Sequence, residues 1–250
     1  MIFENEGESA MSESASNRVA VVTGAGRRRI GNCVARMLAE RGFDIVLHYH
    51  SSRDAARDGA AELRGLGTRV ELMPADVTKE SDVDHFFDAV WQRFGRLDVL
   101  VTTASVWCRK SLEQVTADDL RRNFDVDTLG TFLCCRRAGL LMAQQKHGGA
   151  IVTLGDWAIS RPYPDHAAYF VAKGAIPTLT RMLAVELAQR NPAVRVNCIM
   201  PGPVMLPADL PDEERRLAIG GTLVRREGRP EDVGSAVLFL VENCFVTGTS

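Results

Sequence analysis

The stretch RVAVVTGAGRRRIG, residues 18–31, decides the fold of this 250-residue chain. Its first half is a short run of β-branched and small apolar residues, which is typical of a buried strand. A glycine-rich turn follows directly, and NCVARMLAERG (32–42) then has the apolar spacing of a helix. A strand, a glycine-rich turn and a helix in immediate succession indicate the start of a βαβ unit.

The same alternation of strand and helix continues along the chain. It predicts an α/β fold, a single Rossmann-type doubly wound parallel sheet with helices on both faces, over residues 18–250. The expected strands are 18–24, 44–50, 69–76, 97–105, 149–156 and 194–202, and the expected helices are 30–41, 54–66, 80–94, 117–144, 167–190 and 230–242. The long irregular segment PGPVMLPADLPDEERRLAIGG (201–221) has four prolines around an acidic helical patch, and it is expected to be a mobile lid.

Composition and charge exclude several classes of protein. A hydrophobic content of 46% can fill a large core, which excludes disorder as the main state. No apolar run is long enough for a membrane span. Residues 1–17 carry four glutamates and no basic residue, so we expect a disordered acidic tail, no secretory or mitochondrial leader, and a cytoplasmic protein. The tail's charge of −4 leaves +2 for residues 18–250, which gives no reason to expect nucleic acid as a partner.

The cysteines and histidines give no sign of a metal site. The six cysteines form no CxxC pair and no cluster with histidine at metal-ligand spacing, so we expect buried thiols at Cys33, Cys108, Cys134, Cys135, Cys198 and Cys244. His48 and His50 share one strand face, but no third ligand lies near them in the sequence. We therefore expect no metal.

The turn TGAGRRRIG (23–31) predicts a phosphate site. Glycines at a strand-to-helix turn let the backbone approach a pyrophosphate, and the helix N-terminus offers N–H groups and the positive end of its dipole. The alternative is an ordinary turn between a strand and a helix. The phosphate site is favoured because the turn TGAGRRRIG follows the first strand of a βαβ series.

The end of the second expected strand indicates which dinucleotide binds. An NAD enzyme places a carboxylate there, but residues 48–53 contain none. Basic and hydroxyl groups suit the 2′-phosphate of NADPH, and they come from Arg27, Arg28, Arg29, His50, Ser51, Ser52 and Arg53. The alternative is that the arginines form a solvated surface. Asp76 would accept from the adenine amino group or else cap a helix.

The segment YFVAK (169–173) contains the candidate catalytic pair. Tyr169 and Lys173 are four residues apart, so both side chains lie on one helix face. Tyrosine has a pKa of about 10, and an adjacent ammonium can lower it into the working range of an acid–base group. An isolated YxxxK is often only surface sequence, but here it follows the fifth strand of a dinucleotide-type sheet.

These motifs together resemble the short-chain dehydrogenase/reductase family over residues 18–250. TGAGRRRIG is similar to the family's TGxxxGxG, ADVT (75–78) to its adenine site, TTAS (102–105) to its NNAG, and MPGPV (200–204) to its loop beside the nicotinamide. The resemblance implies an oxidoreductase whose cofactor is held by Gly24, Arg27, Arg28, Arg29, Ile30, Gly31, Tyr49, His50, Ser51, Ser52, Asp76, Val77, Thr103, Ala104, Ser105, Tyr169, Lys173, Pro201, Gly202 and Val204.

Three departures from the family pattern resemble pteridine reductases. The turn is one residue longer than usual, with Arg29 where the middle glycine is expected. Asp156 stands thirteen residues before the tyrosine, where serine is usual. Trp107 in TTASVW (102–107) matches an aromatic residue that stacks on the pterin. The resemblance implies substrate contacts from Ser105, Trp107, Asp156 and Tyr169. LHYHSS (47–52) adds to the likeness, although Ser51 stands where arginine is more usual.

The aspartate suits a pterin chemically. A ring nitrogen of a pterin must be protonated as hydride reaches the adjacent carbon, and Asp156 with Tyr169 can pass that proton from solvent. Lys173 would hold the nicotinamide ribose, and Trp107 would stack on the bicycle. The alternative is that Asp156 only caps a turn and Trp107 belongs to the core.

Asp127 weakens the likeness to the family. It stands in NFDVDTLGTF (123–132) where an asparagine normally holds a water linked to the lysine. A carboxylate there would draw the charge of Lys173 towards itself, reduce the acidification of Tyr169, and slow turnover or shift its pH optimum. Asn123 could replace it only if the helix has another register.

Two expectations concern the whole subunit. CFVTGTS (244–250) stops before the strand that usually closes the sheet in this family, so we expect a missing last strand, lower stability and a more open site. The family resemblance also implies a homodimer or homotetramer formed through the helices at 117–144 and 167–190.

Three functions stay open at this point. The first is an NADPH-dependent reductase of dihydropterin or dihydrofolate. The second is a reductase of 3-oxoacyl thioesters or other small ketones, which Asp156 disfavours because a carboxylate repels a developing alkoxide. The third is an NADP(H)-binding regulator without catalysis, which the intact Tyr169 and Lys173 disfavour.

Overall fold

The computed structural model describes residues 17–250, and its centre is a parallel sheet with strand order β3-β2-β1-β4-β5-β6. The strands are β1 (Val19–Thr23), β2 (Asp44–Tyr49), β3 (Val70–Pro74), β4 (Val99–Thr102), β5 (Gly149–Leu154) and β6 (Val194–Ile199). The chain moves outward from β1 to β3 and then returns to the other side of β1, so the strand order reverses between β1 and β4. The predicted doubly wound α/β fold is confirmed.

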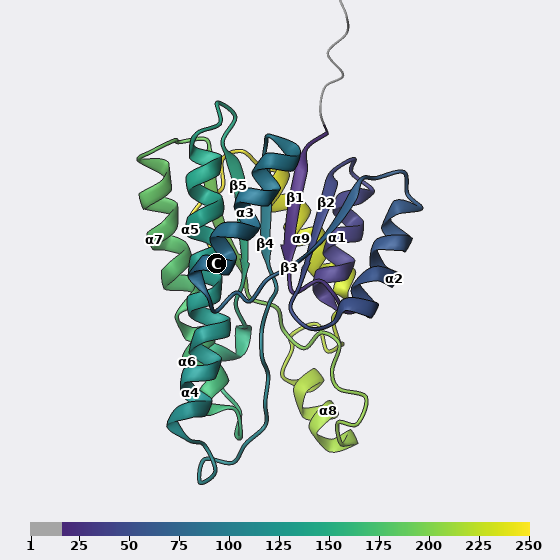
Figure 1. Ribbon diagram of the computed structural model, residues 1–250. Coiled ribbons are helices and arrows are strands. Elements are labelled where there is room, and N and C mark those ends of the chain that lie inside the picture. Colours follow the sequence, from purple (N-terminus) through teal and green to yellow (C-terminus); the bar gives the residue numbers. More distant parts are fainter. Residues whose placement is uncertain (1–16) are drawn as a thin grey trace, which may run out of the picture.

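Helices cover both faces of the sheet (Figure 1). One layer contains α1 (Ile30–Ala39), α2 (Arg53–Arg64) and α9 (Pro230–Glu242), and the other contains α3 (Glu80–Phe94), α5 (Gly130–Ala143) and α7 (Ile176–Ala188). Successive side chains of β1 enter opposite cores, because Val19 and Val21 pack with the second layer while Ala20 and Val22 pack with the first. Burial on both faces explains the continuous apolar runs.

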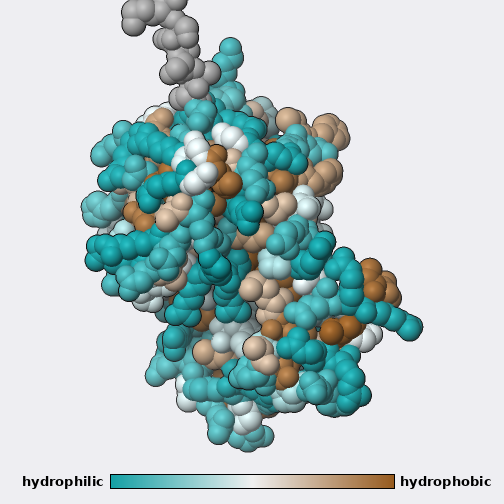
Figure 2. All heavy atoms as spheres, turned by 90° about the vertical axis from the view of Figure 1, so that its right-hand side faces the viewer, coloured by the Kyte–Doolittle hydropathy of each residue, from teal (hydrophilic) through white to brown (hydrophobic). Residues whose placement is uncertain are grey.

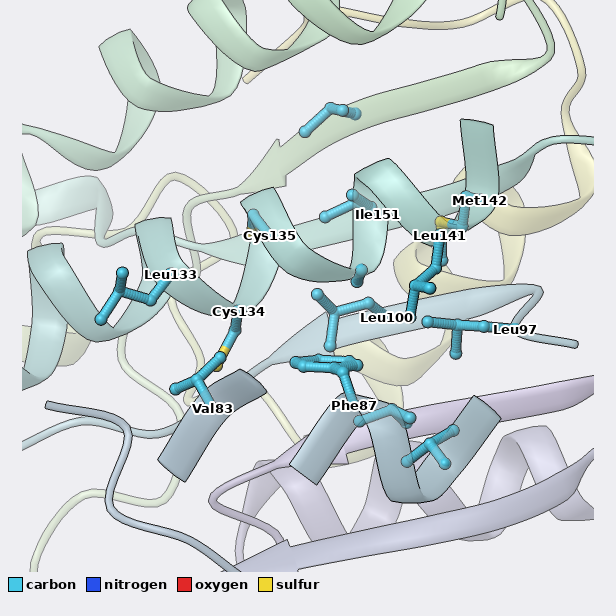
Figure 3. Packing of buried hydrophobic residues seen from close by; sticks show 14 of the residues in the cluster. Val83, Phe87, Leu97, Leu100, Leu133, Cys134, Cys135, Leu141, Met142 and Ile151 are labelled. Carbon is cyan, nitrogen blue, oxygen red and sulfur yellow. The ribbon is translucent and has the colours of Figure 1, made fainter. Parts of the chain in front are cut away.

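The core beneath α5 shows how the second layer is held (Figure 3). Phe87 from α3 and Leu100 from β4 are fully buried there, as is Ile151 from β5. Cys135 of α5 is fully buried in the same cluster. This packing fixes α5 against the strands whose ends carry the candidate site.

Two of the expected long helices are divided. The range 117–144 consists of α4 (Ala117–Asn123), the π-helical segment η1 (Phe124–Leu129) and α5. The range 167–190 consists of α6 (Ala167–Gly174) and α7, which meet at Ala175. Pro177 explains the second break, because proline has no N–H for the carbonyl one turn earlier.

The acidic patch of the proline-rich segment is helical, as expected. It forms α8 (Asp212–Gly220), with three acidic residues in its first turn. The short 3-10 helix η2 (Trp157–Ser160) follows β5. Figure 1 places α8 below the sheet, on the side where the strands end.

The final residues run along the free edge of β6. Gly248 N–H donates to Val196 O at 2.8 Å, and Cys198 N–H donates to Thr249 O at 2.9 Å. The segment therefore occupies part of the place where a further strand would pair, although the described residues form six strands. The expectation of a missing last strand stays a prediction. The expected acidic tail lies outside the described residues except for Asn17, which bonds Asp44.

The six cysteines do not all fit the prediction of buried thiols. Cys134, Cys135 and Cys198 are buried and Cys33 is partly so, but Cys108 and Cys244 are exposed because they lie in loops. All six are unpaired. Within residues 17–250 no three His, Cys, Asp or Glu side chains group as metal ligands would, and no helix is long and apolar enough to cross a membrane.

His48 joins the ends of three strands. Its Nδ1 accepts from Gly24 N–H at 3.0 Å, and its Nε2–H donates to Ala75 O at 3.0 Å. This double role requires the neutral ring, and burial lowers the pKa of His48 to about 4. The histidine therefore fixes the phosphate turn to the ends of β2 and β3.

A neutral buried histidine makes stability depend on pH. The unfolded histidine binds a proton near pH 6.5, whereas the folded one resists it, so stability is present above that pH and is lost as pH falls towards 4. The free energy of unfolding of the native protein, less that of His48→Gln, should fall by about 2 kcal/mol between pH 7 and pH 5. Urea titrations at both pH values measure it, and a constant difference would contradict the assignment.

Candidate functional site

The candidate site lies at the carboxyl ends of the strands, where the strand order reverses between β1 and β4. Gly24 has a φ of +66°, and a Cβ on it would lie 2.6 Å from Ala104. A Cβ on Gly31 would lie 2.3 Å from Thr103 Oγ1. Both glycines are therefore required for the turn after β1 to pack against the end of β4.

The phosphate turn also reaches the end of β2. A Cβ on Gly26 would lie 2.4 Å from Ser52 Oγ and 2.8 Å from the Cβ of Tyr49. Helix α1 begins at Ile30, directly after Arg29, so its N-terminus faces this junction. The structure thus brings together the turn and the strand end that the sequence assigned to one dinucleotide site.

The basic groups of this site differ in their surroundings. Arg27 and Arg29 are exposed, as are His50 and Ser51. Arg28 is exposed too, but it pairs with Glu62 of α2. The site thus combines a turn whose backbone a ligand can approach closely, a helix N-terminus and exposed cationic side chains. These features fit an anionic dinucleotide.

Asp76 is held by its own loop. Its Oδ1 accepts from Thr78 N–H at 3.1 Å and from Thr78 Oγ1 at 2.7 Å, and Lys79 pairs with it at 3.3 Å. Burial raises its pKa, but these hydrogen bonds outweigh that effect and the net pKa is lowered. Contact with an adenine remains a prediction. Its neighbour Val77 is buried against Gly130.

The candidate catalytic side chains come together as expected. Tyr169, on α6, donates from its hydroxyl to Asp156 Oδ2 at 2.7 Å. The other oxygen of Asp156 accepts from Ala158 N–H at 2.8 Å, so Asp156 caps η2 as well as binding the tyrosine. Lys173, one turn further along α6, lies with its Nζ 5.9 Å from the centre of the Tyr169 ring. Its ammonium donates to Leu154 O at 3.0 Å.

Asp127 faces the lysine from the π-helical segment. Its Oδ1 lies 3.4 Å from Lys173 Nζ, and both side chains are buried. Ser105 donates its hydroxyl to the same oxygen, and Val106 N–H donates to Oδ2 at 3.4 Å. Asn123 does not replace Asp127, because its side chain is turned to Val106 O at 3.1 Å.

The electrostatics of this cluster correct one prediction. Burial raises the pKa of Tyr169 far above its usual range, and the charge of Asp156 and its hydrogen bond raise it further. Lys173 does not overcome this, because its charge is shared with Asp127. Burial also raises the pKa of Asp127, against the opposing effect of Lys173. The raised pKa favours the protonated phenol, so the lowering expected from Lys173 is not seen, whereas the opposing effect expected of Asp127 agrees in direction.

Trp107 is not a core residue. It is 45% exposed and stacks on His166 with ring centres 4.6 Å apart and planes inclined by 25°. Tyr163 meets the same histidine edge-on and also contacts Phe170, which packs against Tyr169. An aromatic wall therefore runs from Trp107 to the candidate acid.

The sequence did not single out His166, Tyr163 or Phe170. His166 and Phe170 lie three residues before and one residue after Tyr169, and that proximity was the only signal available. Residues 201–204 behave as expected of a loop at the strand ends, because Trp157 N–H donates to Pro201 O at 3.2 Å. Trp157 also lies beside Gly202, and Val204 bridges to Gly228.

Comparison with known proteins agrees with this geometry. Residues 24–250 match the model of the family described as enoyl-(acyl carrier protein) reductase. The chain is 34% identical to a short-chain type dehydrogenase/reductase of Picea abies, over 90% of this chain and 86% of that protein. The chain belongs to the short-chain dehydrogenase/reductase family. It is accordingly an oxidoreductase of that type.

Solved structures of the family have the same fold. Acetoin dehydrogenase from Enterobacter cloacae matches with a TM-score of 0.83 and 35% identity, over 94% of this chain and 93% of that chain. NAD+-bound xylitol dehydrogenase matches with a TM-score of 0.85 and 30% identity, over 93% and 95%. The family uses NAD(H) or NADP(H), so the choice between them must be argued from this chain's own residues.

Asp127 should control the pH dependence of catalysis. Asp127→Asn removes a negative charge that raises the pKa of Tyr169 and leaves Lys173 with a fuller charge. Loss of reductive activity at alkaline pH should then begin about one pH unit lower. Profiles of kcat/KM for the two proteins measure this. Asp125→Asn, on the same segment, is the control, and coincident profiles for Asp127→Asn would refute the assignment.

Proposed function

We propose that this protein is an NADPH-dependent reductase of a dihydropterin or dihydrofolate. The observation that carries the proposal is the 2.7 Å hydrogen bond from the Tyr169 hydroxyl to the Asp156 carboxylate. A carboxylate beside the acid disfavours an alkoxide, because two negative charges would lie together. It favours a substrate whose ring nitrogen takes up a proton.

Each of the candidate catalytic and substrate-binding residues has a distinct role in such a reaction. NADPH, when bound, supplies the hydride. Tyr169 holds the proton for the substrate nitrogen, and Asp156, which is only partly buried, can take a replacement proton from solvent and pass it on. Lys173 would bind the nicotinamide ribose from its buried position between Leu154 O and Asp127. The exposed ring of Trp107 would stack on the flat substrate.

The preference for NADPH rests on the junction of the turn and β2. Tyr49–Arg53 contains no carboxylate that could bind a ribose 2′-hydroxyl. Arg27 and Arg29 extend from the turn, and no ion pair holds either of them within the described residues. Guanidinium groups can bind a 2′-phosphate with two parallel hydrogen bonds each.

Arg27→Ala and Arg29→Ala should therefore raise the KM for NADPH. Each loss of a charge-assisted contact should cost about tenfold, with the KM for NADH nearly unchanged. Arg36→Ala, which removes an exposed arginine of α1 that pairs with Glu40, is the matched control. Equal effects on both cofactors would mean that these arginines do not recognise the 2′-phosphate.

The second candidate is reduction of a ketone, including a 3-oxoacyl thioester. The relatives named for acetoin and xylitol favour it, because those substrates are a hydroxyketone and a polyol. Asp156 separates the two candidates. A ketone reductase should gain activity from Asp156→Ser, whereas a pterin reductase should lose it.

Consumption of NADPH or NADH should be followed with dihydrobiopterin, dihydromonapterin, dihydrofolate, acetoin and a 3-oxoacyl thioester. We expect turnover of a pterin with NADPH and a loss of about 100-fold in Asp156→Ser. Turnover of a ketone with none of the pterins would overturn the pterin proposal. Binding of NADPH without any turnover, unchanged in Tyr169→Phe, would favour a regulator.

We also propose that the subunit forms a homodimer or homotetramer through α5 and α7. A surface groove beside these helices is mainly apolar, and it is lined by Phe124, Thr128, Leu129, Phe132, Ala175, Thr178, Leu179 and Met182. Exposed apolar surface of this kind favours burial against another subunit. Sedimentation velocity of the full chain tests the proposal.

A further inference from the structure

Beside the candidate site, the loop after β4 and the loop before α6 are joined by a series of contacts. Trp107 stacks on His166, and two residues further along Arg109 Nε donates to Asp165 Oδ2 at 3.3 Å. Next to it, Lys110 N–H donates to Asp165 O at 2.8 Å. The loop after β4 and the loop before α6 therefore form one wall, which carries the aromatic side chains at the mouth of the site.

The same guanidinium reaches a third segment. Arg109 Nη1 lies 3.2 Å from Glu214 Oε1 and 3.1 Å from Oε2, and Glu214 belongs to α8. Arg109 thus holds one carboxylate on the wall and another on the helix below the sheet. These three segments are far apart in the sequence and meet at one side chain.

Helix α8 has little apolar packing to hold it. None of its residues, all of which the structure describes, is buried, and Leu217 is 67% exposed. Figure 2, which faces the side of α8 and α2, shows apolar side chains at the surface of the lower part of the molecule. Arg215 binds Glu227 and Pro207 O, but both lie in the same loop as α8.

Apart from those local contacts, the hydrogen bonds of α8 to other segments of the described chain run through Glu214 and Arg109. Trp157 adds a van der Waals contact at the far end, because its ring lies beside Gly221. The position of α8 over the site therefore depends on an ion pair more than on burial.

We propose that Arg109 is a positioning residue that fastens α8 over the site and couples its closure to the Trp107–His166 wall. The side chains of Arg109, Asp165 and Glu214 are 52%, 31% and 41% exposed, so the link is a weak one that can open in each catalytic cycle. Breaking it should open the helix without disturbing the core. The part of the proposal that concerns substrate rests on the proposed function, but the closure itself does not.

The first test measures closure without any substrate. Hydrogen exchange of the backbone amides of residues 212–221 should be about two- to fivefold faster in Arg109→Ala and Glu214→Gln than in the native protein. The matched control is Glu213→Gln, which makes the same change of charge on the neighbouring residue of α8, where the partner is Arg216. Exchange in the control should equal that of the native protein.

Two further comparisons isolate the ion pair. The double variant should exchange no faster than Glu214→Gln alone, because both substitutions break the same contact. Raising NaCl from about 0.05 to 0.5 M should speed exchange in the native protein and not in Glu214→Gln, since salt screens exposed charges. Arg109→Lys should restore only part of the protection, because an ammonium cannot reproduce the forked contact.

The second test uses turnover of whichever substrate the assays identify. Arg109→Ala should raise the KM for that substrate about two- to fivefold, with kcat and the KM for NADPH nearly unchanged. Unchanged exchange of 212–221 in both variants would overturn the proposal, whatever the substrate proves to be. Faster exchange in Glu213→Gln as well would also overturn it, because the effect would then belong to the net charge of α8.

Discussion

The site depends on how closely the turn after β1 approaches the end of β4. Gly24 and Gly31 have no side chain, and a single methyl group on either would overlap residues 103–104. His48 then fixes the same turn to the ends of β2 and β3 through its neutral ring. This close packing therefore fixes the backbone of the candidate dinucleotide site. It also fixes the positions of Ser105 and Trp107, because these residues directly follow β4 in the chain.

A second constraint is electrostatic. Two carboxylates and one ammonium lie around a single phenol, and most of this group is removed from water. Burial of Lys173 would be costly without a partner, and Asp127 supplies one. The same pairing leaves less positive charge for Tyr169, so the arrangement stabilises the protonated phenol. Burial and Asp156 are the larger causes of the raised pKa of Tyr169, and the pairing of the buried lysine with Asp127 adds to them.

The sequence predicted the sheet, its order of strands and helices, and the meeting of Asp156, Tyr169 and Lys173. Those predictions depend on local periodicity and on short motifs, which a single sequence contains. The opposing effect of Asp127 on the pKa of Tyr169 was expected, but its extent could not be predicted, because it depends on burial and on the distance between Lys173 and Asp127 across two helices. The stack of His166 on Trp107 was missed for a similar reason. A stack between loops leaves no periodic apolar pattern.

The π-helical segment Phe124–Leu129 determines where Asp127 lies relative to the loop after β4. A π turn contains about one residue more than an α turn. Here that residue lies between Asn123, whose amide binds Val106 O, and Asp127, whose carboxylate binds Val106 N–H. Deleting one residue would restore a regular α-helix and leave the later side chains facing nearly as before, because six residues of π-helix turn about as far as five of α-helix. It would, however, change the spacing of Asn123 and Asp127 on either side of Val106. The length of this segment therefore matters as much as its side chains, because the extra residue sets where the carboxylate beside Lys173 lies.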